Sequence, residues 1–229
     1  MNFGTYFCLI IVPLLLGFWA TARVKGAFSK YSQIRASSNL SGAETAREIL
    51  AAAGIRDVDV VEVNGMLGDH YDPTQKRLCL SSEVYHEPSI ASVGVAAHET
   101  GHAIQHARAY LPLQARMAVV PITQFASQLL PFIMFGGIFL GLLPWQLAIK
   151  LGALCYGVLT VFQLITLPVE FDASRRAKVI LAQMGIVQRG EEMNGVNTVL
   201  NAAALTYVAA FVAALGNFMY LLMLSDRRR

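Results

Sequence analysis

The apolar positions of this chain gather in four long stretches and do not alternate with polar positions. The stretches cover residues 6–22, 118–143, 147–167 and 202–224. Each approaches or exceeds the roughly 20 residues that an α-helix needs to cross the hydrocarbon core of a bilayer. The pattern predicts about four transmembrane helices.

The first polar segment shows the shorter periods of a folded domain. Ser41 followed by Glu44 is a capping box, which opens a helix. We expect this helix to end near Ala53, because Gly54 suits the position after a helix C-terminus. Residues 57–63 are rich in valine and alternate in polarity, so they predict a strand.

The same segment continues with a hairpin and a second helix. Residues 69–72 and 76–80 flank a Pro-Thr-Gln turn and predict two paired strands. Pro88 suits the first turn of a helix, which we expect to run to about Tyr110. These elements predict a small α+β domain over residues 23–117.

Composition supports the membrane interpretation and excludes other classes. Only 14% of the residues are charged, whereas soluble domains carry about 25%. The net charge of +3 is small, and no basic stripe interleaved with aromatic residues is present, which argues against a nucleic-acid partner. The cysteines Cys8, Cys79 and Cys155 are scattered, so they indicate neither a disulfide framework nor a cysteine zinc site.

The first apolar stretch has two interpretations. Residues 20–22, Ala-Thr-Ala, resemble a signal-peptide cleavage site. However, no positive charge precedes the stretch, whereas Arg23 and Lys25 follow it. This order favours an uncleaved anchor whose N-terminus lies outside.

The distribution of basic residues predicts the orientation in the membrane. Residues 23–117 and 171–201 carry 14 of the 18 lysines and arginines, which places both segments in the cytoplasm. Lys150 and the arginines 227–229 then fall outside, and this tail disagrees with the rule. Either the last stretch does not fully cross the membrane, or the earlier charges outweigh the tail.

The second predicted helix of the domain carries the motif His98-Glu99-Thr100-Gly101-His102. Two histidines at positions i and i+4 lie on one helical face, so both imidazoles can reach one metal ion. Apolar neighbours make this a half-buried helix, in which unpaired imidazoles would be costly. The motif therefore predicts a zinc hydrolase in which His98 and His102 bind Zn²⁺ and Glu99 is the catalytic base.

A catalytic zinc usually has three protein ligands and keeps one position for water. His106 continues the i+4 series, but it lies about 12 Å along the helix axis from His98. His70 and His86 stand in a predicted hairpin or loop without a supporting motif. His70 and Tyr207 are also candidates for stabilising an oxyanion.

Glu170 is the carboxylate that best fits a third ligand. It stands where the third apolar stretch leaves the membrane, and a carboxylate there is costly unless it is paired or bound to a metal. Small residues follow it at i+3, i+4 and i+7, so another helix can approach closely. Alternatively, Glu170 marks the membrane interface and pairs with Arg175 or Arg176, and the residues alone leave both readings open.

Three segments together resemble the YugP-like family of membrane zinc metallopeptidases. They are His-Glu-Thr-Gly-His-Ala-Ile-Gln-His at 98–106, Glu-Phe-Asp-Ala-Ser at 170–174 and Asp-His-Tyr-Asp-Pro at 69–73. The resemblance covers nearly the whole chain and implies a location in the bacterial plasma membrane. It also implies a neutral zinc-peptidase activity with His98, His102 and Glu170 as ligands.

The chain departs from the wider zincin group that uses a glutamate as third ligand. Those proteins carry an aspartate four residues after the glutamate, whereas this chain has Ser174 there and Asp172 two residues after Glu170. The departure leaves open which groups orient the two metal-binding histidines.

The expected fold is a mostly α-helical membrane protein with about four transmembrane helices and a small α+β, zincin-like cytoplasmic domain. The predicted order is an N-terminal anchor, the zincin-like domain, a transmembrane helix pair, a cytoplasmic helix with the third ligand, and a last membrane helix with the basic tail. These segments cover residues 1–22, 23–117, 118–167, 168–201 and 202–229.

The expected function is a multi-pass zinc endopeptidase that acts at the cytoplasmic face on a peptide or membrane-protein substrate. Its other partner is membrane lipid. The hairpin at 69–80 offers either an edge strand for an extended peptide or a core strand pair.

Two other functions are compatible with part of the pattern. An intramembrane zinc protease would need the motif helix to cross the bilayer, although this helix carries Glu99, His106 and Arg108. A non-catalytic zinc scaffold or chaperone factor would normally need four protein ligands.

Overall fold

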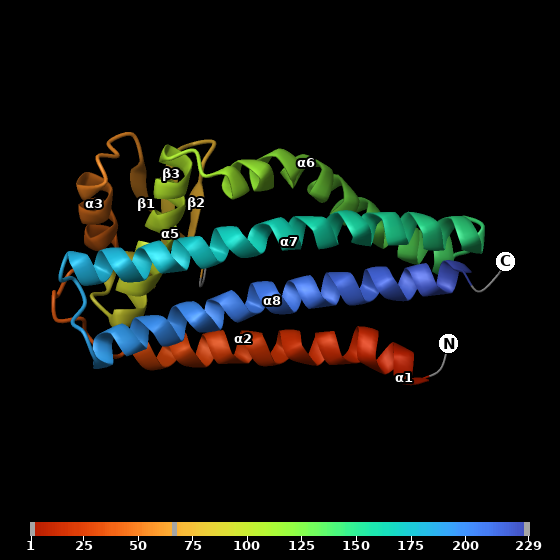
Figure 1. The fold of residues 1–229 in the computed structure, drawn as a ribbon, viewed down its shortest axis with the longest axis horizontal. Coiled ribbons are helices and arrows are strands. Elements are labelled where there is room, and N and C mark those ends of the chain that lie inside the picture. Colours follow the sequence, from red (N-terminus) through yellow and green to blue (C-terminus); the bar gives the residue numbers. More distant parts are fainter. Residues whose placement is uncertain (1–2, 66–67, 227–229) are drawn as a thin grey trace. The chain divides into compact units, whose positions relative to one another are not determined.

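The computed structural model describes residues 3–65 and 68–226 and is mostly helical (Figure 1). Among these residues, four helices are long and apolar enough to cross a membrane by length and composition. They cover Phe3–Tyr31, Leu111–Phe139, Trp145–Gln183 and Glu191–Asp226. The four predicted apolar helices are confirmed as helices. The arginine tail at 227–229 lies outside the described residues.

These long helices continue beyond the apolar stretches that predicted them. Their parts are α1 (Phe3–Tyr6), η1 (Phe7–Ile11), α2 (Val12–Tyr31), α6 (Leu111–Pro131), η2 (Phe132–Phe139), α7 (Trp145–Gln183) and α8 (Glu191–Asp226). The apolar stretch predicted an end near residue 167 for the third helix, but α7 runs 16 residues farther. The added turns contain several alanines and two arginines, which are good helix formers.

Contacts divide the chain into two compact units. The first contains Met1–Thr21, Ala115–Pro168 and Leu205–Arg229, and the second contains Ala22–Gln114 and Val169–Ala204. In the first unit, α6, η2, α7 and α8 bury small and aliphatic residues against one another. Large apolar side chains such as Phe125, Phe132 and Phe139 stay exposed there. Such a surface suits contact with lipid better than contact with water.

The second unit contains a small sheet with the helices α3 and α5 beside it (Figure 1). Its elements are α3 (Gly42–Ala52), β1 (Asp59–Val63), β2 (His70–Asp72), β3 (Arg77–Ser81), α4 (Ser82–His86) and α5 (Ile90–Ala107). Within the described residues, the strand order is β1-β3-β2. β2 pairs antiparallel with β3, which confirms the predicted hairpin, and β1 pairs parallel with β3.

Local signals explain where the two predicted helices of this unit begin and end. The capping box is present: Ser41 N–H donates to Glu44 Oε2 at 2.8 Å, and Glu44 N–H donates to Ser41 Oγ at 3.2 Å. Gly54 follows α3 with φ +73°, as expected for a helix end. α5 is shorter than predicted at both ends. Its N-cap is Ser89, whose Oγ accepts from Ser92 N–H.

The helix α5 is the centre of the second unit. One side packs Ile90, Val93 and Ala97 in a core that also contains residues of α7 and α8. The other side packs Ala91 and Ala96 in a core that contains Leu78 and Leu80 of β3. The helix is therefore buried on most of its surface, more than the half-buried helix that the sequence predicted. This packing holds the metal motif on a rigid element.

Candidate metal centre

Three predicted ligands lie together in the second unit. His98 and His102 stand one turn apart on α5, and Glu170 stands on α7. Glu170 Oε2 lies 3.2 Å from His98 Nε2 and 3.5 Å from His102 Nε2. One potential ligand atom from each residue lies within 4.8 Å of the others, and all three residues are buried. This is the only group of three or more such side chains within residues 3–65 and 68–226 that could hold an ion.

A close approach of two backbones brings the glutamate to the histidines. A Cβ atom built on Gly101 of α5 would lie only 2.9 Å from the carbonyl oxygen of Ala173 on α7. Any side chain at position 101 would therefore force the two helices apart. Gly101 lies inside the motif, and Ala173 lies one turn after Glu170, so the contact sets the spacing of the ligands.

The alternative partners of Glu170 are engaged elsewhere. Arg175 and Arg176 both bind Asp172, and the distance from Arg176 Nε to Asp172 Oδ2 is 2.5 Å. Glu170 instead faces two imidazoles from a position that is only 2% exposed. A buried carboxylate is costly unless it is paired or bound to a metal. This arrangement favours the ligand reading over the interface reading.

The outer nitrogens of both imidazoles have partners. Ser174 Oγ lies 3.1 Å from His98 Nδ1, and Gln105 Oε1 lies 3.0 Å from His102 Nδ1. Because an amide oxygen only accepts, His102 carries its proton on Nδ1 and keeps the Nε2 lone pair for a metal. Ser174 stands where the wider zincin group has its aspartate.

Gln105 is a residue that sequence reasoning missed. Its Nε2 donates to Asp172 Oδ2 at 2.9 Å and to the carbonyl oxygen of Val169 at 2.8 Å. Gln105 therefore connects Asp172 to His102. The only signal in the sequence was the spacing of three residues between His102 and Gln105.

Glu99 lies beside the metal cluster with a perturbed acidity. Burial raises the pKa of this carboxyl, and the nearby His98 and His102 act in the opposite direction. Glu170 and Asp69 raise the pKa of Glu99 further by their negative charge. A carboxyl group with a raised pKa can accept a proton and hold it, as a general base must.

The other histidines of the chain are held away from the cluster. His70 Nδ1 lies 2.8 Å from Gly68 O, and His86 Nε2 lies 3.1 Å from Glu62 Oε2. His106 Nδ1 lies 2.9 Å from Tyr71 Oη. None of the three belongs to the group that could hold an ion.

Comparison with known proteins identifies the family. The model of a family described as "Putative neutral zinc metallopeptidase" matches residues 6–226. The chain belongs to this family. A relative from Bacillus subtilis (strain 168), named "Putative membrane protease YugP", is 48% identical over 216 residues, which are 94% of each of the two chains. No solved structure matches the chain.

The cluster fits the metal that the family name gives. Two imidazole nitrogens and one carboxylate oxygen form a known donor set of catalytic zinc, with a fourth position left for water. The partners of the outer ring nitrogens orient both imidazoles, as is usual for metal-binding histidines. The motif helix α5 is not among the four candidate membrane spans, whereas Glu170 stands on α7, which is one of them.

Proposed function

We propose that this protein is a membrane-embedded zinc endopeptidase that hydrolyses peptide bonds at the cytoplasmic face of the bacterial plasma membrane. The observation that carries the proposal is the buried cluster of His98, His102 and Glu170 with Glu99 beside it. Zinc at such a site supplies a Lewis acid and lowers the pKa of water bound to it. Family membership supports the same activity.

Each side chain of the site has a distinct role in the proposal. His98, His102 and Glu170 hold Zn²⁺, and Ser174 and Gln105 keep the two imidazoles oriented. Glu99 accepts a proton from the attacking water and passes it to the amine of the leaving peptide.

The sheet offers a place for an extended substrate. β3 is the central strand and its residues 78–81 are buried, so the hairpin forms part of the core. β2 (His70–Asp72) is at the outer edge of the described sheet, where a peptide could add its own main-chain hydrogen bonds. The proposed substrate is therefore a peptide or an unfolded segment of a membrane protein.

A peptidase assay with a chelator tests this function. Detergent-purified protein loaded with zinc should cleave casein, lose activity with 1,10-phenanthroline and regain it when zinc is restored. The alternative is a non-catalytic zinc scaffold or chaperone factor, which normally needs a fourth protein ligand. Absence of cleavage by protein that holds one zinc per chain would favour that alternative.

A further inference from the structure

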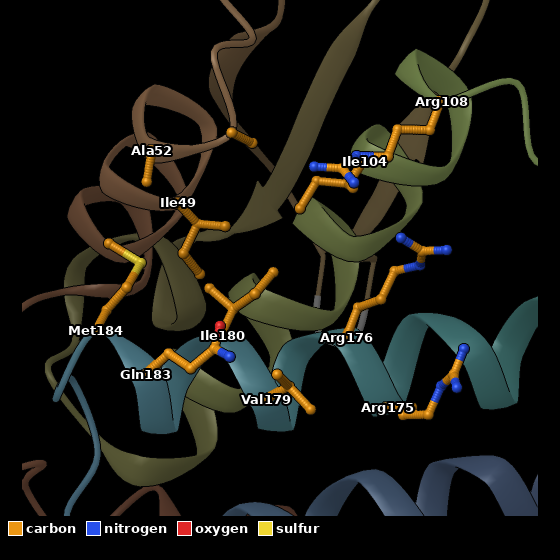
Figure 2. A pocket seen from close by; sticks show the side chains of 11 residues that line it. Ile49, Ala52, Ile104, Arg108, Arg175, Arg176, Val179, Ile180, Gln183 and Met184 are labelled. Atoms are coloured by element: carbon orange, nitrogen blue, oxygen red, sulfur yellow. The ribbon is translucent and has the colours of Figure 1, made fainter.

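A pocket of about 470 Å³ opens in the second unit among side chains of α3, α5 and α7 (Figure 2). Neither the cluster of His98, His102 and Glu170 nor Glu99 lines it, so the pocket is separate from the metal centre. Its volume falls in the range of 300–1,000 Å³ that is usual for small-ligand sites.

The two ends of the pocket differ in chemistry. Three arginines from α7 and the end of α5 lie at one end, and aliphatic side chains lie at the other together with Met184 and Gln183 (Figure 2). The basic end holds Arg108, Arg175 and Arg176, and the apolar end holds Ile49, Ala52 and Met184. A ligand that fits both ends carries a negative group next to an aliphatic body.

The positive charge at the basic end exceeds what nearby acids neutralise. Arg175 and Arg176 share the single carboxylate of Asp172. In the part of the chain that the structure describes, Arg108 forms no ion pair, so three guanidinium groups face one carboxylate and two positive charges remain. Each guanidinium has five N–H donors, which leaves donors on Arg176 after its Nε binds Asp172.

We propose that this pocket binds a small aliphatic carboxylate and that its occupancy strengthens zinc binding at the metal centre. The carboxylate contacts the guanidinium groups of Arg108 and Arg176. The aliphatic chain lies against Ile49 and Met184. A fatty acid and the C-terminus of an apolar peptide share this chemistry.

A chain of hydrogen bonds connects the pocket to the metal centre. Oδ2 of Asp172 accepts from both Arg176 and Gln105. Gln105 Oε1 in turn accepts from His102 Nδ1. A bound anion partly neutralises the arginines, so that they offset less of the negative charge of Asp172. The anion also adds negative charge near a cation site. Both effects favour the binding of Zn²⁺. This part of the inference rests on the proposed zinc site.

Ligand binding can be measured without any peptidase assay. A trifluoromethyl label on Met184→Cys, in a chain whose native cysteines are replaced by alanine, reports on the apolar end by ¹⁹F NMR in nanodiscs. Octanoate should shift this signal saturably, while neutral octanamide and short acetate should not. A second label at Ile34→Cys, an exposed position outside the pocket, should stay unchanged.

Two variants make the binding test specific. Arg108→Gln should weaken octanoate binding about tenfold, which is about 1.4 kcal/mol, because it removes a hydrogen bond between charged groups. Ala52→Phe fills the apolar end and should also weaken it. N-acetylleucylleucine and octanoate separate the two sources, and the tighter ligand identifies the natural one. Equal shifts with octanamide, equal shifts at position 34, or unchanged affinity in both variants would overturn the site.

The coupling has its own test. Zinc affinity, measured by competition with a chelator, should rise about threefold at saturating octanoate, as expected for a unit charge acting through partly polar surroundings. Linkage requires zinc to tighten octanoate binding by the same factor. Identical octanoate affinity with and without zinc would overturn the coupling. Failure of the casein assay would refute the peptidase function and leave these binding results intact.

Discussion

Glu170 is the side chain that joins α7 to the histidine pair on α5. If it is the third zinc ligand, Glu170→Ala should lower zinc occupancy severely and abolish peptidase activity, because two imidazoles alone hold the ion weakly. His106→Ala is the matched control. His106 Nδ1 is held by Tyr71 outside the cluster, so this variant should keep its zinc. Metal analysis after gel filtration measures the zinc content of both variants. If His106→Ala lost its zinc and Glu170→Ala kept it, the third ligand would be His106 and not Glu170.

A substitution of Gln105 tests whether the hydrogen bond to His102 Nδ1 contributes to zinc binding. Gln105→Ala removes the acceptor of His102 Nδ1 and should weaken zinc binding about tenfold to a hundredfold, the usual cost of losing such a partner. Chelator competition measures the change. Gln75→Ala changes an exposed glutamine in the hairpin turn and should leave zinc affinity at the wild-type value. Equal affinities in the two variants would show that Gln105 has no part in orienting His102.

Single residues were predictable to different degrees. His98, Glu99 and His102 could be assigned because their spacing within one helix sets their relative positions. The residues around Glu170 left two roles open, a metal ligand or a carboxylate at the membrane interface. The family resemblance implied the ligand role. Gln105 could not be found, since its partners Asp172 and Val169 are more than 60 residues away and only tertiary packing brings them close.

At the scale of elements, the spacing between α5 and α7 depends on Gly101. Gly101→Ala places a Cβ 2.9 Å from a backbone oxygen, so we expect the helices to separate at a cost of about 1–3 kcal/mol in folding stability. Zinc affinity should fall with it, because Glu170 moves away from the histidines. Thermal unfolding and chelator competition measure both effects.

Gly94→Ala on the same helix is the matched control for this prediction. The nearest atom to a Cβ there is on the side chain of Val196 at 3.5 Å, which is ordinary contact. Alanine is the better helix former by about 1 kcal/mol, so Gly94→Ala should match or exceed the wild-type melting temperature. If Gly101→Ala behaves in the same way, the close approach does not set the ligand spacing.

Elements were predictable where the signal is local. The capping box, Gly54 and the hairpin turn lie within a few residues of the structure that they specify, and all three were confirmed. The parallel pairing of β1 with β3 was not predicted, because pairing partners that are distant in the chain leave no local pattern. The continuous length of α7 was also missed, since apolarity indicates where a helix can cross lipid and not where it ends.

At the scale of the whole molecule, the predicted cytoplasmic side of the metal domain can be tested by labelling. A cysteine at the exposed Ser82, in a chain without its native cysteines, should be shielded from an impermeant thiol reagent in intact cells. The physical reason is the excess of lysine and arginine in residues 23–117 and 171–201.

Leu142→Cys provides the opposite control for the labelling experiment. Leu142 is 73% exposed and lies between η2 and α7, which the predicted topology puts outside. This cysteine should react in intact cells, whereas the cysteine at position 82 should react only after permeabilisation. The reverse pattern would place the metal centre outside the cell and overturn the proposed location.

The central claim, a zinc peptidase whose base is Glu99, is tested most directly by Glu99→Gln. Zinc content and casein cleavage should be measured on the same purified preparation. Because the base is not a ligand, the variant should hold about one zinc per chain, like the wild type, and should lose its peptidase activity. A variant that cleaves casein at the wild-type rate, or that has lost its zinc, would contradict the account.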